Sequence, residues 1–152
     1  MYLFPAEDLQ GLQEEINKIN ERIGKIGKEV GASTRDGGET SHDNFAFEQG
    51  QRQAAMWSVK LRQLVAIINN SEIVLPCRET DKVSIGLTVT VVDETTKEED
   101  TFRIGGYMVF DEGVSISYEA PLAKIIMGAR VGDFRTGKIA DTIKMFRILE
   151  IK

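Results

Sequence analysis

The sequence has a single cysteine, a single histidine and only three prolines among its 152 residues. Cys77 has no second cysteine with which to form an intramolecular disulfide, and this fits a protein of the reducing cytosol. No run of about 18 apolar residues is present, so we expect no membrane-spanning helix. The first residues also lack the basic and apolar regions of a signal peptide. These absences predict a cytoplasmic protein that does not bind membranes.

The chain also lacks an excess of positive charge. Its net charge is −5, with 8 basic and 11 acidic residues over 1–72 and 11 basic and 13 acidic residues over 73–152. Proteins that bind nucleic acid on their own usually carry a strongly basic surface that neutralises phosphates. We therefore expect no autonomous DNA binding.

What the first half does contain is two apolar heptad patterns of equal length. In both, apolar or small residues recur at alternating intervals of three and four residues, at Leu9, Leu12, Ile16, Ile19, Ile23, Ile26 and Val30, and at Phe47, Gly50, Ala54, Trp57, Leu61, Leu64 and Ile68. Such a repeat is typical of a coiled coil. If the chain folds back on itself, the two patterns pair in order, from Leu9 with Ile68 to Val30 with Phe47. Residues 1–72 are therefore predicted to form an antiparallel coiled-coil hairpin, within a monomer.

The segment between the two patterns, about residues 31–43, is predicted to be the loop at the tip of this hairpin. It contains three glycines and no large apolar side chain, a composition that favours a turn. Its acids include Glu39 and Asp43, with Asp36 as a possible third, and His42 lies beside them. These residues are either solvated loop acids with a helix cap, or part of a site that needs carboxylates.

The second half, residues 73–152, has a different pattern. Segments that alternate β-branched and polar residues predict strands, and Pro121 followed by apolar residues up to Gly128 predicts a short helix. The strand segments are Ile73–Leu75, Leu87–Val92, Thr101–Ile104, Val114–Tyr118 and Lys144–Ile151. Together they predict a small α+β domain, a twisted antiparallel sheet with one short helix.

Two stretches of this second half resemble the Gre transcript-cleavage factors of bacterial RNA polymerase. The stretch Val114-Ser-Ile-Ser-Tyr-Glu-Ala-Pro-Leu-Ala-Lys-Ile-Ile-Met-Gly-Ala-Arg-Val-Gly-Asp133 is similar to the family's strand, its Ser-Pro helix and its Gly-Lys-Lys-Val-Gly-Asp segment. Leu87-Thr-Val-Thr-Val91 is similar to the first long strand of that domain. The resemblance covers nearly the whole chain. It implies a coiled-coil finger followed by an FKBP-like domain that docks on RNA polymerase, and we expect an exposed apolar patch on that domain.

The resemblance also implies a function. Gre factors insert their finger into the secondary channel of RNA polymerase, where tip carboxylates help to hold a second Mg²⁺ and the polymerase cuts its own backtracked RNA. The chain would then be no enzyme and carry no cofactor of its own. Its partners would be RNA polymerase and the 3′ end of the nascent RNA. By this resemblance Glu39 and Asp43 would share the Mg²⁺ with the polymerase, and Arg35 and Arg52 would contact RNA, or else be cations of the helix surface.

At the tip the sequence departs from the family motif Gly-Asp-x-x-Glu-Asn-Ala-Glu-Tyr. Asn44 matches the motif's Asn and Asp43 replaces the Glu before it, whereas Ala46 replaces the second Glu. Glu39 is the nearest counterpart of the first Asp, but it lies four residues before Asp43 instead of three. His42 is an additional potential ligand or proton carrier.

Two alternatives follow. The altered spacing of the acids leaves open a channel-binding regulator that inhibits or modulates transcription without stimulating cleavage. The second alternative belongs to another functional class. It is a stand-alone enzyme, either a prolyl isomerase or a metal hydrolase that uses Glu39, His42 and Asp43. The sequence shows no nucleophile–base pair that would support such an enzyme.

Overall fold

The computed structural model describes residues 1–36, 44–75, 78–111 and 113–152. Its contacts divide the chain into two compact units. The first, which we call the sheet unit, comprises residues 1–11 and 71–152, and the second, which we call the helical unit, comprises residues 12–70. Each unit is described by itself.

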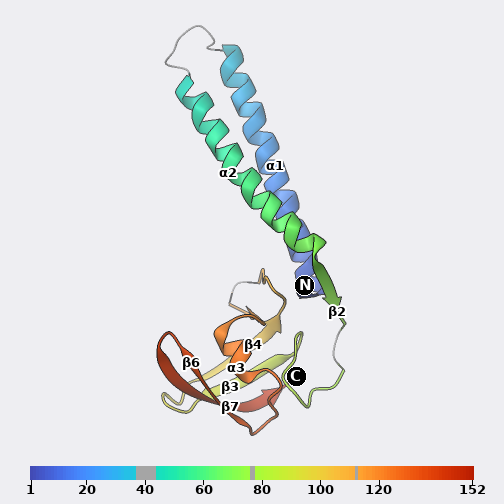
Figure 1. Cartoon of the computed structure of the whole chain (residues 1–152), viewed down its shortest axis with the longest axis vertical. Coiled ribbons are helices and arrows are strands. Elements are labelled where there is room, and N and C mark those ends of the chain that lie inside the picture. Colours follow the sequence, from blue (N-terminus) through green and yellow to red (C-terminus); the bar gives the residue numbers. More distant parts are fainter. Residues whose placement is uncertain (37–43, 76–77, 112) are drawn as a thin grey trace. The chain divides into compact units, whose positions relative to one another are not determined.

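The helical unit consists of two long helices, α1 (Ala6–Asp36), whose first residues belong to the sheet unit, and α2 (Asn44–Asn69). They run side by side in opposite directions (Figure 1). Every position of the two heptad patterns is buried or half-buried, and the most buried are Leu12, Ile16, Ile19, Ile26 and Leu64. The predicted helical hairpin and its seam are therefore confirmed, because an apolar stripe of this period is what two long helices bury against each other.

Gly50 shows how closely the two helices approach. A Cβ atom at this position would collide with Cγ2 of Val30, and Cγ2 of Ile26 lies 3.9 Å from the same point. The absence of a side chain at Gly50 thus makes room for Val30. Further along, the guanidinium of Arg22 lies 4.7 Å from the ring centre of Trp57. In these two contacts the residue with the higher number on α1 meets the residue with the lower number on α2, as two antiparallel helices require.

The end of α1 differs from the expectation. The sequence predicted a helix that ends near Val30 and a loop that begins at Gly31, but α1 continues to Asp36. One glycine in a helix costs only about 1 kcal/mol relative to alanine. Extending an existing helix is cooperative, so a cost of that size does not stop it. Residues 37–43 of the predicted loop lie outside the described residues.

The sheet unit contains a five-stranded sheet with the order β5-β4-β3-β7-β6. Its strands are β3 (Thr88–Asp93), β4 (Glu99–Gly105), β5 (Ser115–Ser117), β6 (Phe134–Ile139) and β7 (Thr142–Ile151). Strands β3 and β4 form the predicted hairpin, with Thr90 opposite Thr101. The fold class is confirmed, although the sheet is mixed instead of purely antiparallel because β5 runs parallel to β4.

The short helix α3 (Pro121–Ile126) covers one face of the sheet. Its Ala123 and Ile126 are fully buried, and the same core contains Val89 and Val91 of β3 and Ile148 of β7. Ile125 of α3 lies directly over Gly137 of β6, where a Cβ atom would collide with it. The helix starts with proline at its first position, as predicted.

A short strand at the N-terminus, β1 (Tyr2–Pro5), pairs in parallel with β2 (Ser71–Val74). Phe4 is fully buried, and the amide of Tyr107 donates a hydrogen bond to the carbonyl oxygen of Leu3 at 2.9 Å. These contacts place residues 1–11 in the sheet unit. The observed division therefore differs from the expected one, which assigned residues 1–72 to the finger and 73–152 to the second domain.

Candidate functional site

The acidic residues predicted at the tip, Glu39 and Asp43, lie outside the described residues, as does His42. Their place in the chain is known, since they fall in the segment that joins α1 to α2. Asp36 is the last residue of α1 and Arg35 lies in its last turn. The structure therefore describes the two helices that lead to the tip, and the tip site itself stays a prediction.

Arg52 is the one predicted RNA-contacting residue whose exposure the structure describes. It lies on α2, two turns beyond the N-terminus of that helix, and its side chain is exposed. Further down the same helix, Trp57 is half-buried in the seam, as predicted from its heptad position. Arg22 of α1 and Lys60 of α2 lie over its ring, at 4.7 Å and 5.6 Å from the centroid. Such cation–π contacts stabilise the flank of the hairpin.

Among the described residues, no group of three histidine, cysteine, aspartate or glutamate side chains is placed to hold a metal ion. In that same part of the chain, no helix is long and apolar enough to cross a membrane.

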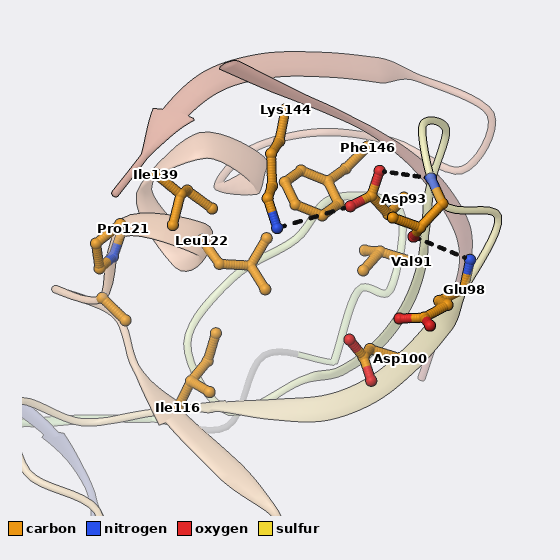
Figure 2. Close-up of a pocket in the computed structure, with 12 residues that line it drawn as sticks. Val91, Asp93, Glu98, Asp100, Ile116, Pro121, Leu122, Ile139, Lys144 and Phe146 are labelled. Atoms are coloured by element: carbon orange, nitrogen blue, oxygen red, sulfur yellow. Dashed lines mark hydrogen bonds and ion pairs between the residues drawn. The ribbon is translucent and has the colours of Figure 1, made fainter. Parts of the chain in front are cut away.

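The sheet unit carries a pocket of about 340 Å³ between α3 and the sheet (Figure 2). Apolar side chains form its floor and one wall, namely Val91, Ile116, Pro121, Leu122, Ile139 and Phe146. Figure 2 shows three acids on the side opposite Pro121, Leu122 and Ile139, namely Asp93 at the end of β3, Glu98 in the turn that follows and Asp100 at the start of β4. This volume lies near the lower end of the range of about 300–1,000 Å³ that is typical of ligand pockets.

The carboxylate of Asp93 is hydrogen-bonded mainly to the turn that follows it. Its Oδ1 accepts hydrogen bonds from the amides of Thr95 at 2.9 Å and Thr96 at 3.4 Å. Its Oδ2 lies 3.9 Å from Nζ of Lys144, across the end of the pocket. The carboxylate is therefore a structural cap of the β3–β4 turn whose charge is compensated by a lysine.

Exposed apolar residues also occur on the β6–β7 hairpin, where Phe134, Ile143 and Met145 are 56%, 73% and 42% exposed. The pairing of Thr136 with Met145 and of Lys138 with Ile143 places these side chains on one face of the hairpin. Thr136, Lys138 and Arg147 share this face, so the exposed apolar side chains lie among polar ones, and the apolar docking patch stays a prediction.

Sequence reasoning did not identify the pocket. Its apolar residues come from four strands and a helix, so they share no spacing that the sequence could reveal. The one local signal is the run of acids after Val92, in the segment between the predicted strands Leu87–Val92 and Thr101–Ile104.

Comparisons with known proteins place the chain among transcription factors. A family profile described as "Transcription elongation factor, GreA/GreB, C-term" matches residues 78–152. The transcription elongation factor GreA of Aliarcobacter butzleri is 32% identical over 111 residues, which are 72% of this chain and 69% of that protein. GreA of Cereibacter sphaeroides is 29% identical over 92 residues, which are 60% of this chain and 59% of the relative. The crystal structure of the GreA factor homolog 1 (Gfh1) protein of Thermus thermophilus aligns with 99% of this chain. The alignment covers 97% of the Gfh1 chain, with 19% identity and a TM-score of 0.44.

Proposed function

Because this chain belongs to the GreA/GreB family of transcription elongation factors, we propose that it binds RNA polymerase and stimulates the polymerase's own cleavage of backtracked RNA. The helical hairpin enters the secondary channel, and its tip reaches the 3′ end of the nascent RNA. The sheet unit docks on the surface of the polymerase. The protein acts as a monomer in the cytoplasm, and the bond-breaking chemistry belongs to the polymerase.

The observation that carries this proposal is the hairpin itself. Its two helices of 31 and 26 residues pack along an uninterrupted apolar seam. At about 1.5 Å per residue, the shorter helix is roughly 39 Å long. The segment that joins the helices carries Glu39 and Asp43. A hairpin of this length suits the delivery of a few carboxylates into a narrow channel.

Glu39 and Asp43 fit a shared Mg²⁺ site by the chemistry of their donors. Mg²⁺ prefers oxygen ligands and is commonly held by one or two protein carboxylates, with water and phosphate oxygens completing its shell. Two carboxylates are thus half of such a site, and the polymerase and its RNA supply the other half. When bound, this second Mg²⁺ would complete a two-metal pair, whose chemistry is to stabilise the attacking and leaving oxygens of a phosphodiester. The role of this chain is to bring Glu39 and Asp43 to the metal site and to orient them.

Arg35 and Arg52 lie close to the tip in sequence and supply positive charge toward the RNA backbone. Phosphate contacts of this kind position a nucleic acid and carry no sequence information. Arg52→Ala is expected to slow cleavage about threefold to tenfold, as the loss of one charged contact does. Arg62→Ala, at an exposed position one heptad or more away on α2, is the matched control and leaves the rate unchanged.

The second candidate function is a regulator that occupies the channel without stimulating cleavage. The spacing of the acids favours it, since Glu39 lies four residues before Asp43 and Ala46 replaces the motif's second Glu. Effective catalysis depends on the placement of the reacting groups within about 1 Å. The same hairpin would then enter the channel, with a tip that does not complete the metal site.

Cleavage in a stalled, backtracked elongation complex with cognate polymerase and Mg²⁺ separates the two functions. The wild-type protein is compared with Glu39→Ala plus Asp43→Ala, and with Glu48→Ala as a control at an exposed acid of α2. Shortened RNA with wild type and Glu48→Ala, but not with the double variant, supports the cleavage function. No shortened RNA, together with competition against a known secondary-channel factor, supports the non-cleaving regulator. If the protein does not bind polymerase at all, both are wrong.

A further inference from the structure

The first turn of α2 presents an aromatic side chain to solvent, directly after the segment that carries the tip acids. Phe45 is 72% exposed, and no other Phe, Tyr or Trp of the described residues is more exposed. We infer that Phe45 is a positioning residue, which stacks on an unpaired base at the 3′ end of the backtracked RNA. This inference rests on the proposed function and adds to it a contact with a base, beside the contacts proposed for metal and phosphate.

Phe45 does not belong to the seam of the hairpin. It lies two residues before Phe47 of the seam, which at 3.6 residues per turn is roughly 160° away around α2. Its ring makes no aromatic or cation–π contact with any described residue. On α1, every exposed residue between 12 and 30 is polar, charged or glycine, so a large apolar ring is not the rule on the outside of this hairpin. Covering the ring with a flat partner would remove its apolar surface from water, and this favours binding.

The same face of α2 continues with residues that suit an RNA strand. Gln49 and Arg52 lie one and two turns after Phe45, and both are exposed. At 1.5 Å per residue, Arg52 is roughly 10 Å from Phe45 along the helix axis, which is about the length of three stacked nucleotides. A stacking ring followed by a cation at this distance can hold a base and a backbone phosphate of one strand. Proteins that bind single-stranded RNA commonly combine these two kinds of contact.

The charges around Phe45 favour contact with a base over contact with a phosphate. The first charged residue of α2 is the exposed Glu48, and the segment before α2 carries Glu39 and Asp43. These carboxylates repel the phosphates of RNA. A base has no net charge, and its flat face stacks on an aromatic ring. Phe45 therefore supplies affinity for the RNA end at a place where acids are needed and a cation is absent.

The test measures the Kd of the full-length protein for a backtracked elongation complex, assembled on synthetic RNA with two unpaired nucleotides at its 3′ end. A matched complex carries abasic sugars at these two positions. On the intact complex we expect Phe45→Ala to raise the Kd about tenfold, as the loss of one stacked base does. Phe45→Tyr and Phe45→Trp keep a flat ring and retain binding, whereas Phe45→Leu keeps apolar volume alone and binds like Phe45→Ala. On the abasic complex, wild type and Phe45→Ala bind equally.

The control is Met56→Ala, which removes a 58% exposed apolar side chain from the same helix and leaves both Kd values unchanged. Circular dichroism and Trp57 fluorescence confirm that each variant keeps the hairpin. Equal binding of wild type and Phe45→Ala to the intact complex would overturn the inference and leave the proposed function in place. An equal loss on both complexes, or full binding by Phe45→Leu, would mean that Phe45 contacts the polymerase itself, and would also overturn it. A wild-type protein that does not bind the polymerase would reject the proposed function and this inference together.

Discussion

Asp8 near the start of α1 and Arg103 of β4 form an ion pair, although 95 residues separate them in the sequence. Nη2 of Arg103 donates to Oδ1 of Asp8 at 2.6 Å, and the amide of Gly106 donates to Oδ2 at 2.7 Å. The side chain of Asp8 is only 5% exposed and that of Arg103 only 19% exposed. Nε of Arg103 also donates to the hydroxyl of Ser115, which in turn donates to Asp111. The first turn of α1 is thus fixed to the sheet by a buried network.

Removing Asp8 should destabilise the sheet unit. Asp8→Ala leaves Arg103 partly buried without its nearest carboxylate and the amide of Gly106 without its acceptor, and we expect a loss of about 3 kcal/mol. Asp8→Asn keeps one acceptor and should cost less. Hydrogen exchange of the amides in β3 and β4 measures the change within this unit.

The control for this prediction is Lys97→Ala. Lys97 pairs with Glu94 at 2.7 Å, but its side chain is 70% exposed, so the loss should be less than about 1 kcal/mol. A cost for Asp8→Ala as small as that of Lys97→Ala would show that the buried network contributes little.

The part of the fold that the sequence predicts best is the helical hairpin, because its apolar residues repeat with the period of the structure that they form. Leu12, Ile19 and Leu64 were assigned to the seam from spacing alone, and all three are buried. In the sheet unit most strands were also predicted from alternation, within a few residues of their bounds.

What the sequence did not predict depends on partners distant in the chain. Asp8 lies in the first turn of α1, where any acid would complement the helix N-terminus, and only the fold brings Arg103 to it. The strand β1 is four residues long, and it pairs with β2, from which the two long helices separate it in the sequence. The strand β6, Phe134–Ile139, is an edge strand whose alternate residues are exposed, so it carries a weak apolar signal. The pocket was missed for the same reason, since its two sides meet only in three dimensions.

The seam should not tolerate a charge. Ile19→Asp or Leu61→Asp places an unpaired carboxylate between the helices, and we expect a loss of about 3 kcal/mol or more. Far-ultraviolet circular dichroism and the fluorescence of Trp57 report on the hairpin. Met56→Asp, at a position of α2 that is 58% exposed, is the control and should retain the helix. Unchanged helix content in both seam variants would contradict the coiled-coil assignment.

Two glycines of the hairpin should respond in opposite ways to alanine. At Gly24 a Cβ atom would meet nothing within 4 Å, so Gly24→Ala should stabilise the helix by about 0.5–1 kcal/mol. At Gly50 a Cβ atom would collide with the β-branched side chain of Val30, which has little rotamer freedom in a helix. Gly50→Ala should therefore give no gain or a loss. Thermal unfolding followed by Trp57 fluorescence compares the two, and equal stabilisation by both would refute the close approach at Gly50.

The turn after β3 should make the stability of the folded protein depend on pH through Glu94. The hydrogen bond from Nζ of Lys97, at 2.7 Å, lowers the pKa of Glu94 below its usual value, helped by the charges of Lys97 and Arg147. Partial desolvation and the neighbouring Asp93 act in the opposite direction on that pKa. A lowered pKa means that the folded state favours the charged form. The resulting stabilisation is fully present above the ordinary carboxyl pKa of about 4.3 and is lost as the pH falls through the lowered pKa.

Glu94→Gln should therefore be less stable than the wild type at neutral pH, and the difference should vanish in acid. A carbon-13 NMR titration measures the pKa of Glu94 directly, and Lys97→Met should raise it toward the ordinary value, because the principal hydrogen bond is then absent. Lys138→Met serves as the control, since it removes a lysine that pairs with Asp141 on a different turn. A pKa of Glu94 that shifts equally in the two variants would mean that net charge, and not the hydrogen bond, sets it.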